Sequence, residues 1–320
     1  MLSPRGQVSD MQRARLLNAA VSAIDELGYA RTSVALITTR ARVSRKTFYD
    51  LFTGREDCLL EILRDTVATL GAELAVARVA EMVWRERVRT SLWLILCFLD
   101  REPALARVCV VQSARGGQRA LEWREGLFAV LARAIDAGRE QSARADRAPS
   151  LTAEGLVGAA VAVVHKRLLE RRRDPLSALL GELMSVIVLP YRGAAAARSE
   201  QARTAPAKPA AIAAGAARAV RAVREDPLAD VPMRLTYRTA RVLSVILADP
   251  GASNRTVGEG ADVYDQGQIS KLLARLDRLG LVANSGQGHA KGEANAWSLT
   301  PLGVSVTQSL RMHEQTESAR

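Results

Sequence analysis

Apolar residues recur at helical spacing along almost the whole chain up to Pro190, and this periodicity constrains the fold more than any other feature. Positions i, i+3, i+4 and i+7 share one face of an α-helix, so repeated stripes of this kind predict helices packed on helices. Aromatic residues make up only 4% of the chain although 48% is hydrophobic, which favours the same mainly α fold. The 320 residues are enough for two or three domains.

The chain is basic, with a net charge of +11 and a pI near 10.3, which suggests an acidic partner such as nucleic acid. Its three cysteines show no paired spacing, which argues for reduced thiols and against a zinc site. The N-terminus lacks the apolar core of a signal peptide, and the apolar stretches are too short to cross a bilayer. These features predict a cytoplasmic, nucleoid-associated protein of bacterial type that contacts no membrane.

Helix caps and composition divide the first part of the chain into two predicted domains. Residues 1–60 contain three short helical patterns that begin at serine or threonine caps, which predicts an N-terminal helix-turn-helix domain. Residues 61–191 predict an all-helical regulatory domain, in which the segments Thr152–Glu170 and Pro175–Leu189 are apolar around most of their circumference. Such helices must be buried on several sides, so we expect them to form the interface of a homodimer.

The rest of the chain predicts a linker and a third domain. Residues 192–226 are Ala-rich, with seven basic residues and one acid between Arg192 and Arg224 and no large apolar face, which predicts a basic linker. Residues 227–320 predict three helices, a β-hairpin with the Gly-rich tip SGQGHAKGE, and a last helix that begins at Thr300 and Pro301. This order predicts a C-terminal winged helix with a small β-hairpin.

The run TSVALITTRARVSRKTFYDLFTGREDCLLEIL (Thr32–Leu63) resembles the DNA-binding domain of the TetR family of repressors. The agreement covers Ser33, Ile37, Val43, Ser44, Thr47, Phe48, Tyr49, Phe52, Glu56 and Leu59. The resemblance implies a double-stranded DNA operator as partner, a small effector bound by the helical remainder, and a dimer formed through its last two long helices. The family normally has glycine in the turn before Val43, where this chain has Arg42. A left-handed residue there would cost arginine about 1 kcal/mol.

Side-chain chemistry assigns the expected DNA contacts of this first domain. Arg45 is the best candidate for direct readout, because arginine can bond guanine O6 and N7 together. Thr47 and Tyr49 can position the helix on phosphates, and the helix N-terminus at Ser33 favours a phosphate as well. The resemblance implies a phosphate contact at the start of the fourth helix, where the family usually has lysine and this chain has arginine. The predicted contacts are Thr32, Ser33, Arg42, Ser44, Arg45, Lys46, Thr47, Tyr49 and Arg55.

The C-terminal domain resembles winged-helix domains of the MarR type in the segments LTYRTARVLSVILADP and GLVANSGQG. The resemblance implies that one helix enters the major groove and that the wing reaches the backbone or minor groove. Winged helices also bind protein partners, and the nearly balanced charge of this domain leaves that alternative open. The expected DNA contacts are Gln266, Gln268, Ser270 and Lys271 on the helix and His289 and Lys291 on the wing.

A small apolar effector would occupy a pocket lined by apolar and aromatic side chains of the central domain. The candidates are Trp93, Cys97, Phe98, Trp123, Phe128 and His165. The simpler interpretation is that the first five are plain core and that His165 is an interface residue. No histidine has metal-ligand spacing with another, and the motifs GxSxG and HExxH and a phosphate loop are missing, so we expect no enzyme, metal or cofactor. The sequence therefore predicts a ligand-responsive transcriptional regulator, most simply a dimeric repressor. The alternative is a non-specific architectural DNA-binding protein.

Overall fold

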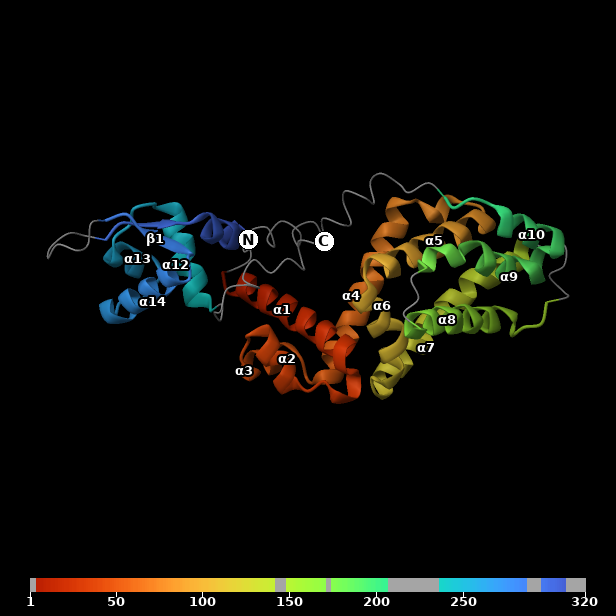
Figure 1. The fold of residues 1–320 in the computed structure, drawn as a ribbon, viewed down its shortest axis with the longest axis horizontal. Helices are drawn as coiled ribbons and strands as arrows, with labels where there is room; N and C mark the ends of the chain where they lie inside the picture. Colours follow the sequence, from red (N-terminus) through yellow and green to blue (C-terminus); the bar gives the residue numbers. More distant parts are fainter. Residues whose placement is uncertain (1–3, 142–147, 171–173, 207–235, 287–294, 309–320) are drawn as a thin grey trace. The chain divides into compact units, whose positions relative to one another are not determined.

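The computed structural model describes residues 4–141, 148–170, 174–206, 236–286 and 295–308 of the chain. Contacts between Cα atoms divide it into two compact units. The first comprises Met1–Asn18, Thr38–Leu51 and Arg221–Arg320, and the second comprises Ala19–Ile37 and Phe52–Val220. Helices dominate both units (Figure 1), which confirms the mainly α fold. Among the described residues, no helix has the length and apolar character needed to cross a membrane.

The chain begins with α1 (Pro4–Leu27), the 3-10 turn η1 (Tyr29–Arg31), α2 (Val34–Ala41) and α3 (Arg45–Leu51). Gly28 ends α1, because its N–H donates to the carbonyl of Ile24 at 2.8 Å and its φ of 81° is open to glycine without strain. The apolar face of α1, which has the i, i+4 spacing of a helix, is buried, with Leu16, Ala20 and Ile24 at most 1% exposed. Local sequence signals therefore determine this part of the fold.

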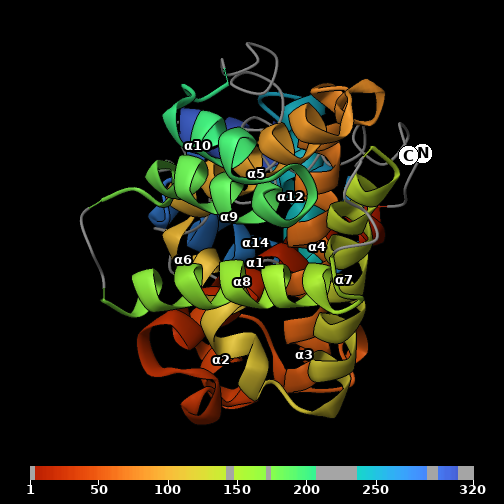
Figure 2. The same ribbon diagram turned by 90° about the vertical axis from the view of Figure 1, so that its right-hand side faces the viewer.

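The second unit is a set of packed helices (Figures 1 and 2). In chain order they are α4 (Arg55–Val76), η2 (Val79–Glu81), α5 (Trp84–Arg101), α6 (Pro103–Ala106), the π-helical turn η3 (Arg107–Gln112), η4 (Ser113–Arg115), α7 (Gln118–Asp136), η5 (Ala137–Gln141), α8 (Thr152–Glu170), η7 (Leu176–Leu179), α9 (Leu180–Arg192) and α10 (Ala194–Ala202). α5 packs against α4 and α9, and α8 packs against α7 and α9. The predicted segment Thr152–Glu170 coincides with α8, whereas Pro175–Leu189 divides into η7 and most of α9.

Trp84, the first residue of α5, connects three of these helices. Its indole Nε1 donates to the carbonyls of Ala134 and Ile135 at the end of α7, at 3.1 Å in both cases. Its ring packs edge-on against Tyr191 of α9, with 5.4 Å between the ring centroids. A Cβ atom at Gly138 would lie 2.5 Å from the indole, so glycine is needed where the turn after α7 passes the ring. The fully buried indole thus fixes α5, α7 and α9 relative to one another.

The structure differs from the predicted linker at residues 192–226, because the first part of that segment is the helix α10. α10 packs along α9 (Figures 1 and 2) and approaches it closely at Gly181, where a Cβ atom would lie 2.8 Å from the carbonyl oxygen of Gln201. Because the two helices approach so closely, small residues such as Ala197 are buried in α10. A helix that packs through small residues has no large apolar face, so its burial could not be predicted from the sequence. Residues 207–226, the rest of the predicted linker, lie outside the described residues.

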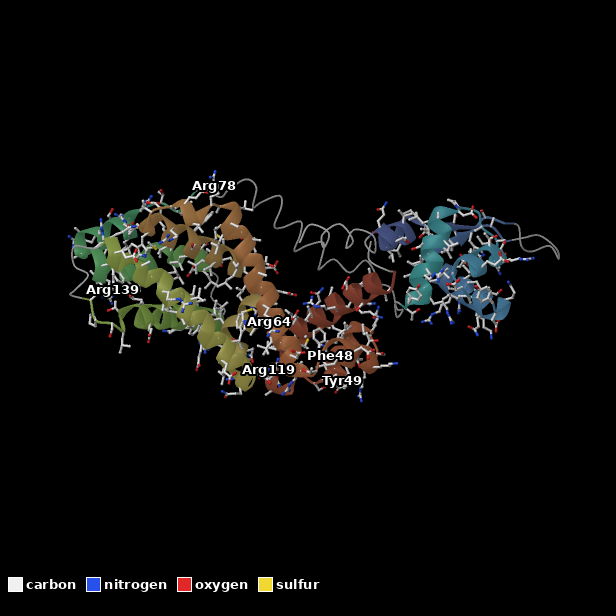
Figure 3. The ribbon with its side chains drawn as sticks, turned by 180° about the vertical axis from the view of Figure 1, so that it is seen from behind. Phe48, Tyr49, Arg64, Arg78, Arg119 and Arg139 are labelled. Carbon is white, nitrogen blue, oxygen red and sulfur yellow. The ribbon has the colours of Figure 1, made fainter. Side chains whose placement is uncertain are left out.

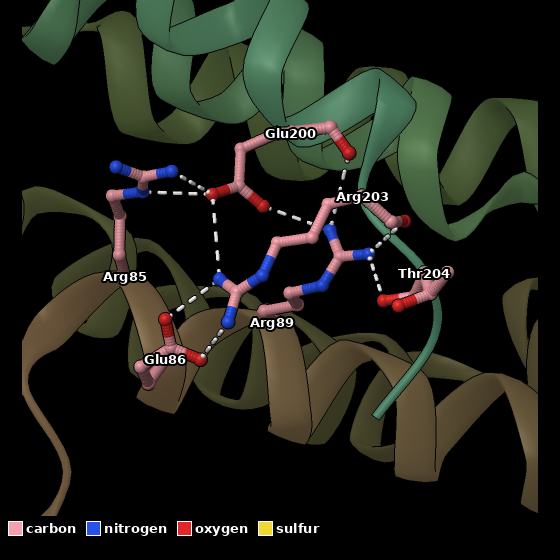
Figure 4. Close-up of polar contacts among 6 residues, drawn as sticks. All are labelled: Arg85, Glu86, Arg89, Glu200, Arg203 and Thr204. Carbon is pink, nitrogen blue, oxygen red and sulfur yellow. Dashed lines mark hydrogen bonds and ion pairs between the residues drawn. The ribbon is translucent and has the colours of Figure 1, made fainter. Parts of the chain in front are cut away.

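Glu200 anchors α10 through a group of side chains that we call the Glu200 clamp: Arg85, Glu86, Arg89, Glu200 and Arg203 (Figure 4). Glu200 is fully buried, and its carboxylate accepts hydrogen bonds from Arg85 at 2.7 Å and Arg89 at 2.8 Å. Arg89 also donates to the backbone carbonyls of Arg203 and the next residue, at 2.6 and 2.9 Å. Arg203 binds both carboxylate oxygens of Glu86, which lowers the pKa of Glu86. Charge-assisted hydrogen bonds thus fix α10 and the residues after it to α5.

The C-terminal part of the first unit contains α12 (Tyr237–Ala248), α13 (Asn254–Gly260), α14 (Gln266–Arg278) and the antiparallel strands β1 (Val282–Asn284) and β2 (Trp297–Leu299). Side chains of Thr236, Ser253 and Asp265 cap the three helices. Thr300 caps a further helical segment, residues 301–308, as predicted.

This C-terminal part is built around an apolar core that also includes Val8 and Met11 of α1. The inner face of α14 is buried, with Ile269, Leu273 and Leu276 at 0% exposure, and Trp297 of β2 packs in the same cluster. Val282 pairs with Leu299 in the two-stranded sheet, and an isolated bridge joins Ala252 to Trp297. The order of elements is the predicted one, but a two-stranded sheet does not by itself establish a winged helix.

The Glu200→Ala variant should be strongly destabilised. It leaves Arg89, which is 1% exposed, without its buried counter-charge, and breaking a buried ion pair in this way costs about 3–5 kcal/mol. Urea denaturation should show this loss in the free energy of unfolding. The neighbouring exposed substitution Gln201→Ala should change it by less than about 0.5 kcal/mol. Equal loss in the two variants would contradict the anchoring role of Glu200.

Candidate nucleic-acid interface and ligand cavity

The turn between α2 and α3 sets the direction of the predicted recognition helix. The N–H groups of Arg42 and Val43 donate to the carbonyls of Thr39 and Thr38 at 3.2 and 3.1 Å, which closes the turn. Arg42 has a φ of 53°, so the turn has the left-handed residue at which glycine is the unstrained choice. The backbone cost expected for arginine at this position therefore applies.

α3 turns its first residues toward solvent. Ser44 caps the helix, because its Oγ accepts the N–H of Thr47 at 3.0 Å, and the two hydroxyls also bond each other at 2.8 Å. Phe48 is fully buried, which fixes the rotation of the helix about its axis, and its ring meets Tyr49 edge-on (Figure 3). Tyr49 is 59% exposed. The predicted contacts that this rotation leaves exposed are Arg45, Lys46 and Tyr49.

The two residues predicted to bind phosphate at the start of α2 lie in different environments. Ser33 is exposed and caps α2, with its Oγ accepting the N–H of Leu36 at 3.2 Å. Thr32 is fully buried, and its Oγ1 donates to the carbonyl of Gly28 at 3.0 Å. Thr32 therefore stabilises the turn before α2 and presents no hydroxyl to a ligand.

Arg55, a predicted phosphate contact, has a structural role in the protein. Its Nη1 donates to the carbonyls of Tyr29 at 3.1 Å and Thr32 at 2.8 Å, and its guanidinium stacks 4.3 Å from the centroid of the Tyr29 ring. Burial raises the pKa of Tyr29, and the charge of Arg55 opposes that effect. Arg55 thus ties the start of α4 to η1. Sequence analysis could not find this role, because the carbonyls come from a turn more than twenty residues earlier.

Four predicted contacts of the C-terminal domain are exposed on α14: Gln266, Gln268, Ser270 and Lys271. Two of them bond neighbouring helices. Gln268 Oε1 accepts a hydrogen bond from Arg238 at 2.9 Å, and Ser270 Oγ accepts one from Asn254 at 3.0 Å. Outside the described residues are the two contacts predicted on the wing, His289 and Lys291.

A cavity of about 260 Å³ lies inside the second unit, lined by residues of α4, α5, η3, α7, α8 and α9. The apolar stripes that the sequence shows on α5 and α7 form much of its wall: Leu92, Ile95, Leu96, Leu99, Leu127, Leu131 and Ile135. Val130 of the same α7 stripe is instead 51% exposed. Two aromatic candidates from the sequence, Trp123 and Phe128, also line the cavity.

The other four predicted ligand contacts do not line this cavity. Trp93 and Cys97 lie on the side of α5 that faces away from it, because they are roughly half a helical turn from Ile95 and Leu99. Phe98 is a buried core residue, and His165 is a partly buried residue of α8 outside the lining.

The polar residues of the cavity wall are not among the predicted ligand contacts. Thr66, Ser91, Cys109 and Ser113 supply small polar groups, and Arg87 and Arg124 supply the charges. Arg87 precedes Ser91 by four residues, and Arg124 precedes Phe128 by four. A cation one turn before a lining residue on the same helix face is the signal that could have identified both arginines.

The π-helical turn η3 connects the cavity to α1 and η1. Cys109 of η3 lines the cavity. At the start of the turn Arg107 binds both carboxylate oxygens of Asp25 in α1, which raises the pKa of the Arg107 guanidinium. At its end Gln112 Oε1 accepts the N–H of Tyr29 at 3.2 Å. One short turn therefore contacts both the cavity and the backbone next to α2, and π-helical turns of this kind are frequent at functional sites.

An apolar face on α8 and α9 is exposed in the single chain. Val163, Leu169, Val186 and Leu189 are 38%, 59%, 49% and 48% exposed. Small residues of α8 are exposed between them: Gly155, Gly158, Ala159 and Ala162. Val161 of α8, by contrast, lines the cavity. This division separates the surface of α8 that is open to a partner from the surface that faces the interior.

Residues 16–62 match the family model described as "Bacterial regulatory proteins, tetR family". The N-terminal domain, which includes α2, the turn and α3, is therefore a TetR-family DNA-binding domain with a helix-turn-helix. Members of this family are transcription regulators and not enzymes. No curated protein matches the chain.

Several solved structures resemble part of the chain. The fatty acid degradation regulator FadR from Bacillus halodurans is 19% identical, with 54% of this chain and 96% of that chain covered and a TM-score of 0.49. FadR from Bacillus subtilis in complex with stearoyl-CoA is 18% identical, with 55% and 97% covered and a TM-score of 0.47. A TetR-like regulator from Rhodococcus sp. RHA1 is 22% identical, with 56% and 94% covered and a TM-score of 0.45.

The Arg42→Gly variant should be more stable than the wild type. Glycine adopts the φ of 53° without the steric cost that arginine carries, and relief of that cost is about 1 kcal/mol. The same change at Arg40, inside α2, should lower the stability by about 1 kcal/mol, because glycine is a poor helix former. Thermal unfolding of both variants measures the difference. A loss of stability in both would contradict the strain assigned to Arg42.

Proposed function

We propose that this chain is a ligand-responsive transcriptional repressor that binds an operator in double-stranded DNA through α3. The proposal rests on the exposed side chains of Arg45, Lys46 and Tyr49. They lie on a capped helix whose rotation about its axis is fixed by the buried Phe48. Arg45 lies in the first helical turn, the part of a recognition helix that reaches base edges in the major groove. Its guanidinium reads guanine O6 and N7, while Lys46 and Tyr49 bind phosphates.

Polar groups around α3 complete the proposed DNA contact. The positive end of the helix dipole at the start of α2, beside exposed Ser33, favours a phosphate of the backbone. Arg42 adds positive charge at the turn, and Ser44 and Thr47 order the first residues of α3. Thr32 and Arg55 are not part of this proposal, because one is buried and the other is bonded to backbone carbonyls.

The cavity is the proposed effector site, and η3 is the proposed link to the DNA-binding domain. A ligand against Trp123 and Phe128 would also press on Cys109 of η3. Movement of η3 would strain the bonds from Arg107 to Asp25 and from Tyr29 to Gln112, which hold α1 and η1. A ligand that favours a shifted η3 would therefore alter the position of α2 and release DNA.

The exposed apolar face of α8 and α9 supports a homodimer. Two copies related by a two-fold axis would each cover Val186 and Leu189 of the other, and the glycines and alanines of α8 would permit close approach. A dimer also explains operator recognition, since two α3 helices then read two half-sites of a palindrome.

The C-terminal domain is proposed to be a winged helix that contacts DNA as an auxiliary reader. The capped α14, its exposed Gln266 and Lys271, and the hairpin after it support this proposal. A tethered second contact adds affinity without tight binding of its own. The alternative that this domain binds a protein partner predicts no change in DNA contacts when it is altered.

A non-specific architectural role is the second candidate function, favoured only by the net charge of +11. It gives no purpose to the apolar cavity. A repressor binds its operator roughly 10³-fold or more tightly than random DNA, whereas an architectural protein shows little difference.

The Arg45→Ala variant should lose operator affinity and relax one base position. Removal of a bidentate base contact costs about 1–3 kcal/mol at the cognate site. Titration of operator variants at fixed salt concentration measures both effects. Lys46→Ala is the matched comparison, because loss of a phosphate contact weakens all sequences alike and reduces the salt dependence. Undiminished operator binding by the Arg45 variant would contradict the assignment of α3.

The Val186→Glu variant should be a monomer that binds the operator weakly. A carboxylate in the centre of the α8–α9 face would be buried without a partner on dimerisation, which is strongly unfavourable. Light scattering gives the mass, and operator titration gives the affinity. Glutamate at Val130, which is similarly exposed on α7, is the control and should remain dimeric. A monomeric wild-type protein at micromolar concentration would overturn the proposed dimer.

A further inference from the structure

We infer that the effector is an anionic amphiphile, with an apolar chain in the cavity and an acidic group bound by Arg87. This inference rests on the proposed effector site and adds the chemical class of the ligand. It is argued from the two arginines of the cavity wall and from the ion pairs that the charged residues next to Arg87 already form.

The cavity wall carries positive charge without any acid. Among its lining residues are Arg87 and Arg124, and none of the lining residues is aspartate or glutamate. Nearly all of the remaining wall is apolar, with hydroxyls at Thr66, Ser91 and Ser113. Both arginines are partly buried, and a charge beside an apolar enclosure is stabilised when it is paired. An anionic group on the ligand would supply that pairing, whereas a cationic or purely apolar ligand would not.

Arg87 is the arginine available for this role. Arg85 and Arg89, two residues away on either side, both bond Glu200, and the adjacent Glu86 bonds Arg203. The side chain of Arg87 has no hydrogen bond or ion pair within the described part of the chain. The acids near the start of α5 are thus already bound by other arginines, and the guanidinium of Arg87 retains its five donors for a ligand.

Arg124 occupies a different position. Its guanidinium lies 4.6 Å from the centroid of the Phe128 ring, so it already has a cation–π contact. Trp84 binds the carbonyl of Ala134, which places the start of α5 beside the end of α7. Arg124 is ten residues before Ala134, or roughly 15 Å along α7, so Arg87 and Arg124 lie toward opposite ends of the wall.

This separation gives the ligand an orientation. An acidic group at Arg87 would be near the start of α5, and the apolar chain would extend between Ile95 and Leu131 toward Phe128. Ser91, one turn from Arg87, can donate a second hydrogen bond to the acidic group. A single acidic group at one end and an apolar chain therefore match the wall in both charge and polarity.

Calorimetric titration of the full chain with three probes of equal chain length tests the inference: dodecanoate, dodecyl phosphate and dodecanol, each below its micelle concentration. We expect the wild type to bind at least one of the anions roughly 10-fold or more tightly than the alcohol, the effect of a charged hydrogen bond. The two anions distinguish a carboxylate from a phosphate. In Arg87→Met this preference should fall to within about twofold, while dodecanol binding is unchanged. Arg124→Met should keep the preference.

The outcomes separate this inference from the proposed function. Equal affinity of the wild type for all three probes, or a preference that persists in Arg87→Met, overturns the inference and leaves an effector site for neutral ligands. Loss of the preference in Arg124→Met alone overturns the assignment to Arg87. Failure of all three probes to bind overturns both the inference and the apolar effector site on which it rests. Retained dodecanol binding in Arg87→Met shows that the variant is folded.

Discussion

The contact of Trp84 with the end of α7 determines the geometry of the second unit. The indole N–H of Trp84 donates to the carbonyls of both Ala134 and Ile135, and the same ring packs on Tyr191 of α9. Because α5, α7 and α9 all line the cavity, the position of this indole also sets the distance between the cavity walls. Gly138 is necessary for the contact, since any side chain there would meet the ring. The cavity is thus a consequence of how one large aromatic residue is packed.

Local signals predicted the parts of the fold that depend on neighbouring residues. Gly28 ends α1, Ser44 caps α3 and the apolar faces of α1 and α14 are buried, because capping and periodicity act within a few residues. α10 could not be predicted in this way. Its sequence is Ala-rich and basic, and its stability depends on Glu200 meeting arginines more than a hundred residues earlier. A pattern of apolar residues does not reveal a helix that is held by a buried ion pair. The segment is therefore predicted to be a linker from its composition.

The same distinction explains the outcome for the candidate sites. Arg45, Lys46 and Tyr49 could be predicted to be exposed, since the family motif and the buried Phe48 fix the rotation of α3. Residues of α5 were harder to assign, because both of its sides are apolar and Trp93 is as apolar as Leu92. A helix turns by about 100° per residue, so the choice between neighbours depends on which helix packs on which side. Only the tertiary structure supplies that information.

The Glu200 clamp and the charge of the cavity have a common origin at the start of α5. The sequence WRERVR, the first two turns of α5, has three arginines and one glutamate. In an isolated helix this excess of positive charge would remain in contact with solvent. Glu200 bonds both Arg85 and Arg89 on one side of the helix, and Glu86 is occupied by Arg203. Arg87 is two residues from each of Arg85 and Arg89, so it lies on the other side of α5, where the lining offers it no acid. The docking of α10 therefore makes a cationic α5 compatible with a packed core, and at the same time leaves one of its arginines for an anion from outside the chain.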